Sequence, residues 1–399
     1  MKICLVNSLY SPYVRGGAEV YVEKIANELS KEHEVIVITS SPYLGTASLN
    51  PLVERIGNIK LYRFYPMNVY YAWNYRKKPM LIKPFWHLVD MWNPHVYSAC
   101  KRILQKEKPD VVHSHCLRGL STAVFHSTAS LRLHHIHTLH DYGLLCRWND
   151  LIRGGRVIKK FNFLDKQYMR IMRNFSGSTD VVLAPSQFIL DIHQSHGYFP
   201  NSLCLKLPNG IELVNIRRKN FDKLRVMYAG ELSLHKGIHL LIRAFRNLSV
   251  KNIELHIAGR GPLFDSIRRY VGRYPHAQIN CYGYVSDQAL RELYQLTNLS
   301  VVPSIWYDNC PLVVLESFSY ANPVAGSRIG GIPEIIKDGC NGFLFDPGDV
   351  TSLCRILETI GESPHKLKRL SENAWNTSRE YSLDDHIKKL MGIYKSVAA

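Results

Sequence analysis

Two carboxylates, Asp308 and Glu316, mark the stretch of the sequence with the clearest potential for chemistry. They lie in the segment PSIWYDNCPLVVLES, which follows the apolar run Leu299–Val302. The segment opens a predicted helix, and Pro311 suits its first helical position. Free N–H groups and the positive end of the helix dipole would face a phosphate placed there. Carboxylates accept hydrogen bonds from vicinal hydroxyl groups, and eight residues of helix rise about 12 Å. The pair is therefore predicted to contact different parts of one ligand.

Turns that follow predicted strands supply glycines and a cation. Gly230 and Lys236 belong to the turn in YAGELSLHKG, and Gly259 and Gly261 belong to the turn in AGRGP. Glycine allows a close approach of the backbone to a ligand, or a positive φ. A tight turn without a ligand explains the second glycine pair equally well. Lys236 is the best single candidate for a phosphate contact, although a lysine beside a turn is commonly just solvated.

A third glycine pair, Gly16-Gly17, lies between the first predicted strand and a helix predicted over Ala18–Ser30. Its backbone N–H groups are placed to meet an anion. His140 follows another predicted strand, but the chain has 18 histidines, most of which must be structural or exposed. The histidines around His113 raise the question of a metal ion. No matching carboxylate pattern accompanies them, so no metal site is predicted.

Short apolar or β-branched runs alternate with helical patterns along the chain, which is typical of parallel α/β sheets. The predicted strands are Lys2–Asn7, Glu34–Thr39, Asp110–His113, His135–Leu139 and Asp180–Ala184, then Arg225–Ala229, Glu254–Ala258, Gln278–Tyr282 and Leu299–Val302. A turn cluster at 208–210 separates the two series. The length of 399 residues exceeds one ordinary core. We expect two Rossmann-like, doubly wound domains facing across a cleft, with ligands at the carboxyl ends of the strands.

The bulk composition narrows the class of protein. The sequence has no run of about 18 apolar residues, so no transmembrane helix is predicted, and the apolar run at the start is too short for a signal peptide. Nine cysteines without a CxxC pair indicate reduced thiols in a cytosolic compartment. The formal net charge of +17 comes mostly from the first half of the chain. It favours an anionic partner, whether nucleic acid, lipid head groups or sugar phosphates.

The C-terminal motifs resemble those of a known family. Asp308 and Glu316 match the motif of two carboxylates separated by seven residues in retaining glycosyltransferases of the GT-B type, in particular glycosyltransferase family 4. The resemblance extends through Gly326, Gly330–Glu334, Asp338-Gly339, Asn341-Gly342 and Pro347–Asp349, and it covers nearly the whole chain. Two positions depart from the family. Asp308 replaces the usual Glu, and Glu231 stands where Arg is common, so no phosphate role is transferred to Glu231.

The resemblance implies a role for each of the residues above. Lys236 would neutralise the donor diphosphate, which the backbone at Gly230 approaches. Glu316 would hold the ribose, Asp308 the transferred sugar, and His140 would contact that sugar from the N-terminal domain. These side chains form the predicted catalytic set, with none assigned as acid, base or nucleophile. The predicted donor-binding set adds Gly16, Gly17, Gly259, Gly261, Asn309, Cys310, Pro311 and Leu312. Neither a cofactor nor a metal is implied, because the UDP- or GDP-sugar is itself the substrate.

The resemblance further implies transfer of a hexose-type sugar, with retention, to a glycan or lipid-linked acceptor in polysaccharide, lipopolysaccharide or glycolipid assembly. The acceptor domain is predicted at 1–214 and the nucleotide-sugar domain at 215–383. The segment 384–399 either ends the second domain or crosses back to the first. A non-catalytic sugar-nucleotide or glycan-binding protein and a sugar-nucleotide epimerase are the alternatives. A Rossmann dehydrogenase is disfavoured, because the first strand lacks a GxGxxG motif followed by an acidic residue.

The stretch Tyr62–Pro94 is rich in tyrosine, tryptophan and cations, among them Trp73, Lys83, Phe85 and Trp86. Interleaved aromatic and basic residues suit nucleic acid or an anionic membrane surface, and an ordinary loop explains them too. Once the donor site is accepted, acceptor or membrane contact is the better prediction, and no nucleic-acid partner is expected. The predicted location is cytoplasmic, either free or peripheral on the inner face of the cell membrane.

Overall fold

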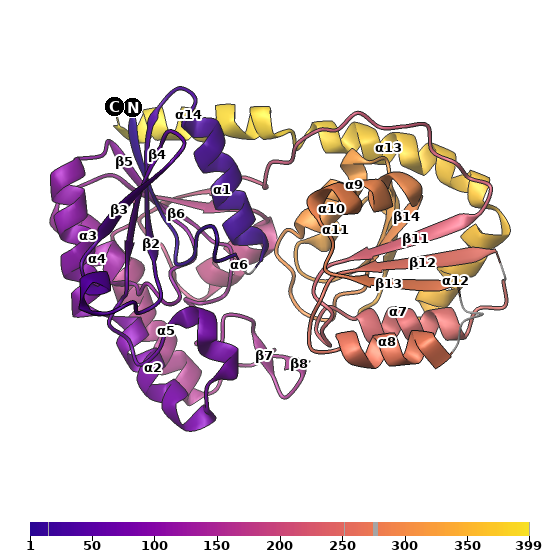
Figure 1. The fold of residues 1–399 in the computed structure, drawn as a ribbon, viewed down its shortest axis with the longest axis horizontal. Helices are drawn as coiled ribbons and strands as arrows, with labels where there is room; N and C mark the ends of the chain where they lie inside the picture. Colours follow the sequence, from indigo (N-terminus) through magenta and orange to yellow (C-terminus); the bar gives the residue numbers. More distant parts are fainter. Residues whose placement is uncertain (15, 251, 274–277, 399) are drawn as a thin grey trace. The chain divides into compact units, whose positions relative to one another are not determined.

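The chain divides into two compact units in the computed structural model, which describes residues 1–14, 16–250, 252–273 and 278–398 (Figure 1). Unit 1 contains residues 1–151 and 159–208 and the chain from His386 on, and unit 2 contains 152–158 and 209–385. These bounds differ from the predicted domains at three places. Unit 1 stops at Pro208 rather than at 214, the segment 152–158 falls in unit 2, and the return to unit 1 begins at His386 rather than at 384.

Unit 1 is built on a sheet with one antiparallel edge. Its strands are β1 (Lys2–Val6), β2 (Glu34–Ser40), β3 (Leu52–Ile56), β4 (Ile59–Phe64), β5 (Val111–Ser114), β6 (His135–Thr138), β9 (Val181–Ala184) and β10 (Leu203–Lys206). Their order is β10-β9-β6-β5-β1-β2-β4-β3, and only β3 runs antiparallel to its neighbour. The five strands predicted here are confirmed. β3, β4 and β10 were not predicted, because charged residues such as Lys60 and Arg63 interrupt or end their apolar runs.

Helices pack along this sheet (Figure 1). They are α1 (Gly17–Leu29), α2 (Lys83–Met91), α3 (Pro94–Glu107), α4 (Ala123–Ser130), α5 (Phe163–Ser176), α6 (Gln187–Ser195) and α14 (Leu383–Ala398), with 3-10 turns η1 (Thr46–Leu49), η2 (Ala72–Lys77) and η3 (Met80–Ile82). In α1, the buried residues Tyr21, Val22, Ile25 and Leu29 recur at helical spacing, which gives the helix one apolar face toward the sheet.

Unit 2 is built on a fully parallel sheet, ordered β13-β12-β11-β14-β15-β16. Its strands are β11 (Leu224–Ala229), β12 (Ile253–Ala258), β13 (Ile279–Gly283), β14 (Leu299–Val302), β15 (Val324–Ser327) and β16 (Gly342–Phe345). Its helices are α7 (Ile238–Arg246), α8 (Phe264–Arg273), α9 (Asp287–Leu296), α10 (Leu312–Ser319), α11 (Ile332–Ile335), α12 (Val350–Glu362) and α13 (Leu367–Arg379), with the 3-10 turn η5 (Pro364–Lys366). The short hairpin of β7 (Ile152–Arg153) and β8 (Arg156–Val157) also falls in this unit. The four strands predicted for the second half are confirmed.

The strand order creates a switch point in each unit. Numbered along the chain, the parallel strands of unit 2 take the spatial order 3-2-1-4-5-6, and those from β4 to β9 in unit 1 do the same. The connections leave in opposite directions from β1 and β5, and again from β11 and β14, so a crevice forms beyond their carboxyl ends. The prediction of two Rossmann-like, doubly wound units is confirmed. The loops that follow β1 and β5 in unit 1, and β11 and β14 in unit 2, therefore lie at the candidate sites.

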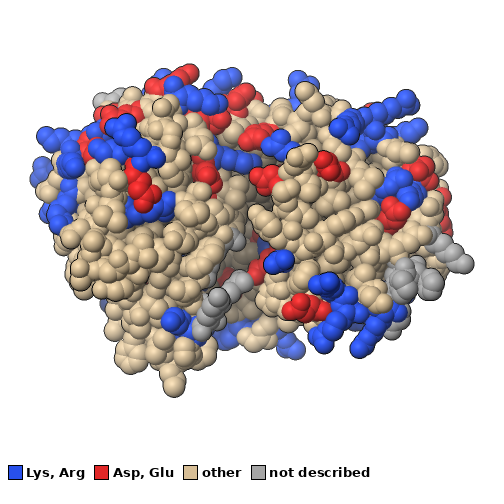
Figure 2. Space-filling view, in the orientation of Figure 1, with Lys and Arg blue, Asp and Glu red and all other residues tan. Residues whose placement is uncertain are grey.

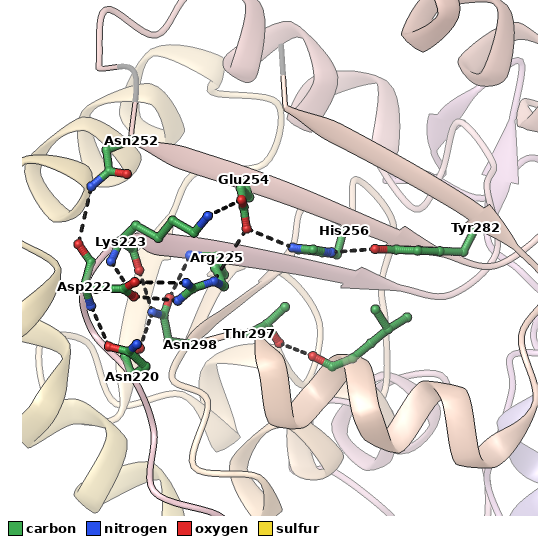
Figure 3. Close-up of polar contacts among 11 residues, drawn as sticks. Asn220, Asp222, Lys223, Arg225, Asn252, Glu254, His256, Tyr282, Thr297 and Asn298 are labelled. Carbon is green, nitrogen blue, oxygen red and sulfur yellow. Dashed lines mark hydrogen bonds and ion pairs between the residues drawn. The ribbon is translucent and has the colours of Figure 1, made fainter. Parts of the chain in front are cut away.

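A polar network fixes the chain where it enters β11 (Figure 3). The two Nη atoms of Arg225 donate to the carboxylate of Asp222 at 2.7 and 3.1 Å, and its Nε lies 3.5 Å from Glu254 on β12. Lys223 forms an ion pair with the same Glu254. Burial raises the pKa of Glu254, but the hydrogen bond from Lys223 and the surrounding cations outweigh it, and the pKa is lowered overall. The network ties β11 to β12 at the end opposite the candidate site.

The stretch 215–223, whose charged composition indicates a linker between the two domains, is anchored to unit 2 by Lys219. Its Nζ donates to the carbonyl oxygens of Tyr294, Gln295 and Thr297 at 2.5, 3.2 and 2.8 Å. Burial lowers the pKa of Lys219 to about 7. The charged composition that suggested a free linker therefore includes a lysine that holds the segment against the end of α9.

Helix α14 packs on unit 1 through a cluster of histidines and tyrosines. This His–Tyr cluster consists of His113, His115, His140, His386, Tyr21 and Tyr394. The hydroxyl of Tyr394 lies 2.6 Å from Nδ1 of His113. His386 Nδ1 lies 2.8 Å from the carbonyl of Pro208 and therefore carries the proton, so Tyr21 donates to its Nε2 at 2.7 Å. Burial is the largest cause of the lowered pKa of all four histidines, which are neutral at neutral pH.

We expect acid to destabilise unit 1 below about pH 6.5. The buried His135 in β6 has its pKa lowered from 6.5 to about 3 by burial. Below pH 6.5 the unfolded chain takes up a proton that the folded chain does not, so the stabilisation present above 6.5 is lost as the pH falls toward 3. The loss at pH 5 is about 2 kcal/mol for each such histidine. Urea unfolding at each pH, monitored through hydrogen exchange of the β6 amides, measures this loss.

The substitution His135→Gln should reduce the pH dependence of that unfolding free energy. The matched control is His134→Gln, because His134 is an exposed neighbour, and it should leave the dependence unchanged. Equal unfolding free energies at pH 5 and pH 8 in the unmodified chain would contradict the neutral state of these histidines.

Candidate active site

Lys236 and Asp308 meet at the switch point of unit 2. Lys236 lies in the turn between β11 and α7, and Asp308 lies in the loop between β14 and α10. Nζ of Lys236 donates to Oδ2 of Asp308 at 2.8 Å, and Oγ of Ser304 donates to the same oxygen at 3.0 Å. Only 6% of Asp308 is exposed. Two of the four residues of the predicted catalytic set are therefore joined in a largely buried ion pair.

Glycines hold the backbone of Asp308 in place. The N–H of Gly331 donates to the carbonyl of Asp308 at 2.7 Å. Gly330 has a φ of 61°, and a Cβ built on it would lie 2.3 Å from the Asp308 carbonyl oxygen. Gly237 has a φ of 74°, and a Cβ there would lie 1.8 Å from the carbonyl oxygen of Pro303. Side chains at these glycines would push apart the loops that carry Lys236 and Asp308.

The turns after β11 and β12 approach each other at Gly230 and Gly259. Their φ angles are 144° and 142°, and a Cβ on Gly259 would lie 1.9 Å from the carbonyl oxygen of Gly230. A Cβ on Gly261 would lie 2.5 Å from the carbonyl oxygen of Leu232. Close packing between turns therefore requires Gly259 and Gly261 whether or not a ligand is bound. The same packing leaves a surface of bare backbone beyond the strands.

Glu316 lies on α10, half-buried beside Tyr294 of α9. Burial first, and then the charge of Glu316, raise the pKa of Tyr294. The ring of Tyr294 stacks on Tyr320 with centroids 5.2 Å apart. Glu316 therefore borders an aromatic surface.

The residues between the two carboxylates form the entry to α10. Asn309 and Cys310 are buried at 8% exposure each, and the helix begins at Leu312. Pro311 precedes the first helical residue instead of occupying it as predicted, a difference of one position at a boundary. The first-turn N–H groups of a helix have no partner within the helix, so this end suits an anion.

His140 lies in unit 1 at the carboxyl end of β6, within the His–Tyr cluster. Its Nε2 is 3.1 Å from Nδ1 of His115, and its ring lies 5.1 Å from that of Tyr21. Burial, with a smaller contribution from His386, lowers its pKa to about 3. An imidazole in this state is suited to hydrogen bonding rather than to donating a proton at neutral pH.

Gly16 and Gly17 lie at the start of α1, as predicted, and the preceding Arg15 lies outside the described residues. The N–H of Gly16 donates to Oε2 of Glu19 at 2.8 Å, which satisfies one of the free donors at this helix end. The nearest atom to a Cβ built on Gly16 would be 3.7 Å away. Capping therefore accounts for Gly16 within the chain, and Gly17 keeps its position as the first helical residue.

Sequence reasoning missed two residues around Lys236. Ser304 binds Asp308, as described above, and the ring centroid of Trp306 lies 5.0 Å from Nζ of Lys236. Nε1 of Trp306 is buried and has no hydrogen-bond partner within the described chain. Both residues belong to the segment that was singled out, but their roles depend on loop geometry. In the part of the chain that the structure describes, no three His, Cys, Asp or Glu side chains are arranged to hold a metal ion.

Two known families match successive parts of the chain. The family Glycosyltransferase Family 4 matches residues 15–214, and Glycosyl transferases group 1 matches residues 212–377. An uncharacterised 42.6 kDa protein in the cps region of Klebsiella pneumoniae is 27% identical over 358 residues, 88% of this chain and 92% of that protein.

Solved structures share the fold over the full length. Sucrose-phosphate synthase from Thermosynechococcus elongatus superposes with a TM-score of 0.76 at 18% identity, covering 99% of this chain and 98% of that one. Anabaena HepE in complex with UDP superposes with a TM-score of 0.70 at 17% identity, covering 99% and 100%.

The two Rossmann-like units, together with these matches, define a glycosyltransferase of the GT-B fold. The family match over half of the chain then assigns it further: the protein belongs to glycosyltransferase family 4. Both statements confirm the GT-B fold and the family 4 membership that the motifs around Asp308 and Glu316 predict.

The close approach of Gly259 to Gly230 predicts a large effect of a single methyl group. Gly259→Ala should lower the free energy of unfolding of unit 2 by about 2 kcal/mol or more, because the new Cβ must displace a neighbouring carbonyl and keep a positive φ. Gly272→Ala in α8 is the control. A Cβ there meets no described atom within 4 Å, so the helix should become up to about 1 kcal/mol more stable. Equal urea midpoints for the two variants would disprove the steric account.

Proposed function

We propose that the protein is a retaining glycosyltransferase that moves a hexose-type sugar from a UDP- or GDP-sugar to a glycan or lipid-linked acceptor. The observation that carries the proposal is the buried pair of Lys236 and Asp308 at the switch point of unit 2. A cation and a carboxylate placed side by side suit a ligand with adjoining anionic and hydroxyl-bearing parts. A nucleoside diphosphate sugar has this chemistry. The bound UDP of Anabaena HepE supports a uridine donor.

The donor would rearrange the ion pair when it binds. A diphosphate offers Lys236 a stronger anion than one carboxylate, with support from the buried Nε1 of Trp306 and the N-terminus of α10. Asp308 would then accept hydrogen bonds from sugar hydroxyl groups. The hydrogen bond from Ser304 keeps the Asp308 carboxylate close to the loop, which suits the shorter side chain of Asp308 compared with Glu. Glu316 would accept hydrogen bonds from the ribose hydroxyls beside Tyr294.

Transfer would proceed on one face of the sugar. The bond from the anomeric carbon to the diphosphate oxygen breaks, and a bond from that carbon to the acceptor oxygen forms on the same side. The leaving phosphate oxygen takes the acceptor proton, while Lys236 and the start of α10 stabilise the negative charge. The neutral His140 would position the donor sugar. The cps region in the name of the Klebsiella pneumoniae relative supports a polysaccharide as the product.

The acceptor side is proposed to reach a membrane surface in the cytoplasm. Within the described residues, no helix combines the length and the apolar character needed to cross a bilayer. Within the stretch Tyr62–Pro94, η3 and α2 together present an exposed apolar face, called the exposed α2 face and defined as Met80, Leu81, Phe85 and Leu88, with 65–85% of each residue exposed. The lower part of unit 1 in Figure 2, where Figure 1 shows α2, carries few charged side chains in this view. An apolar face flanked by Lys83 suits peripheral contact with anionic lipid.

The donor site predicts separable effects of two substitutions. Lys236→Ala should lower donor turnover by about a hundredfold, because charge on the leaving phosphate loses its cation. Glu316→Gln should weaken nucleotide affinity by about tenfold. The donor is first found with a panel of UDP-, GDP- and ADP-sugars read by thermal stabilisation. The exposed Lys366→Ala and Glu292→Gln are matched controls. Unchanged kinetics in Lys236→Ala, or unchanged affinity in Glu316→Gln, would remove that residue from the site.

The products of the same assays separate the alternatives. A transferase gives a new glycoside with the donor's anomeric configuration in its proton NMR spectrum, and it slowly gives free sugar without acceptor. A sugar-nucleotide epimerase would return a nucleotide sugar with an altered ring carbon. A non-catalytic protein would bind the nucleotide sugar and leave it intact with every acceptor. An inverted anomeric configuration would overturn retention alone.

The exposed α2 face predicts binding to anionic vesicles. The double substitution Leu81→Glu and Phe85→Glu should lower the affinity for phosphatidylglycerol vesicles, measured by co-sedimentation, by at least about tenfold. It removes apolar side chains worth about 1–2 kcal/mol each and adds charge repulsion. Leu203→Glu on β10 is the control, because Leu203 is a comparably exposed apolar residue of unit 1. Equal vesicle affinity of the control and the double variant would exclude this face as the contact.

A further inference from the structure

A small cavity in unit 1 lies beyond the carboxyl ends of β5 and β6. Its walls include Asp90, His115, Arg118, Asp141, Arg147 and Tyr168, and its volume of about 50 Å³ is enough for one small polar group rather than a whole sugar. The loop after β5 supplies His115 and Arg118, and the loop after β6 supplies Asp141 and Arg147. His115 is also the partner of His140. The cavity therefore adjoins the His–Tyr cluster, one strand away from the switch point of this unit.

Three buried nitrogen atoms of the wall have no hydrogen-bond partner within the described residues. They are Nη2 of Arg118, Nε of Arg147 and Nε2 of His115. Guanidinium nitrogen atoms can only donate, and leaving buried donors unpaired is unfavourable. Nη1 of Arg118 donates to the carbonyl of Trp148 at 3.2 Å, which holds that guanidinium in place. The wall therefore lacks acceptor oxygens that something inside the cavity must supply.

Positive charge is concentrated around the same cavity. Arg118 and Lys83 both lie over the ring of Tyr75, at 4.1 and 4.6 Å from its centroid. The pKa of His87 is lowered to about 3, chiefly by burial and further by the charges of Arg118, Arg147 and Lys83. His87 is therefore neutral and adds no charge. Arg118 and Lys83, which share the Tyr75 ring, repel each other until an anion joins them.

The carboxylates of the wall offset this charge only in part. Asp141 accepts hydrogen bonds from the N–H of Gly143 at 2.7 Å and from Nδ2 of Asn149 at 3.1 Å, so its loop already uses it. Asp90 accepts from the N–H of Gly119 at 2.8 Å. Burial raises the pKa of Asp90 to about 7, so its negative charge near neutral pH is weaker than that of an ordinary carboxylate.

We propose that this cavity binds an anionic group of the acceptor, a carboxylate or a phosphate, between Arg118 and Arg147. Either group carries the oxygen lone pairs that the unpaired guanidinium nitrogens lack, and guanidinium binds both in planar, charge-assisted geometry. A hydroxyl group would satisfy one donor and leave the positive charge uncompensated. The inference rests on the proposed transferase function, in which the acceptor is held by unit 1. It adds the class of acceptor, an acidic sugar or a phosphorylated one.

Calorimetric titration of the full chain with three matched probes tests the proposal. The probes are methyl glucuronide, glucose 1-phosphate and the neutral methyl glucoside. Each is titrated with the donor site filled by the nucleoside diphosphate that stabilises the chain best, so that the phosphate probe cannot enter there. At least one anionic probe should bind about tenfold or more tightly than the neutral probe. Preference for the carboxylate indicates an acidic sugar, and preference for the phosphate indicates a phosphorylated acceptor.

Substitutions in the wall assign the binding to this cavity. Arg147→Gln and Arg118→Gln should each weaken the preferred anion by about tenfold or more. Arg102→Gln on α3 is the control, because Arg102 is an exposed arginine of unit 1 outside the cavity, and it should leave the affinity unchanged. Arg118 also packs on Tyr75, so Arg147→Gln keeps the test valid if Arg118→Gln unfolds the unit. Circular dichroism and nucleotide affinity report on folding in each variant.

The outcomes separate this inference from the proposed function. Nucleotide binding without any preference for an anionic probe overturns the cavity proposal and leaves the transferase intact. Anion affinity that is unchanged in both arginine variants overturns it as well. Failure to bind or turn over any nucleotide sugar overturns the transferase function instead, and that result is read in the donor panel before the acceptor probes are added.

Discussion

The ion pair between Lys236 and Asp308 joins two loops that lie 72 positions apart in the sequence. An exposed pair of this kind would contribute little to stability. This pair is different, because Asp308 is 6% exposed and shares its oxygen with Ser304, and its backbone carbonyl is bound by Gly331. Loss of either partner would leave a poorly solvated charge. A ligand that draws Lys236 away must therefore bring hydroxyl donors for Asp308, and this requirement selects ligands that carry both an anion and hydroxyl groups.

In unit 2, the same glycines that let two turns pack closely also leave backbone open to a ligand. The turns at Gly230 and Gly259 pack so closely that a single Cβ would collide with a carbonyl oxygen. Because neither turn carries a side chain at the contact, the backbone beyond β11 and β12 stays bare. Bare backbone is what a diphosphate needs for close approach. At these positions the sequence alone does not distinguish a packing requirement from a binding requirement. The absence of a Cβ would satisfy both.

The sequence predicts the framework well where apolar runs are continuous. β1, β5, β11 and β14 were found because parallel strands buried on both faces carry few polar residues. β4 was missed because Lys60 and Arg63 lie within it, and their side chains reach Glu107 and Glu54 in contacts that no local pattern reveals. The predicted donor-binding residues came from a specific motif. Trp306 and the cavity arginines did not, because a cation over a ring or an unpaired nitrogen exists only once distant loops are brought together.

The buried histidines and Asp141 of unit 1 are poorly suited to act as a base or a nucleophile in the proposed transfer. Histidines of the His–Tyr cluster are kept neutral by burial, and His140, with a pKa of about 3, is a weak base that is not in the acidic imidazolium form at neutral pH. The neighbouring Asp141 is bound by the N–H of Gly143 and by Asn149, which makes it a poor nucleophile. Neither side chain is therefore suited to take the acceptor proton or attack the sugar. In the transfer that we propose, the leaving phosphate oxygen takes that proton, and unit 1 would hold the acceptor in place while the donor supplies the base.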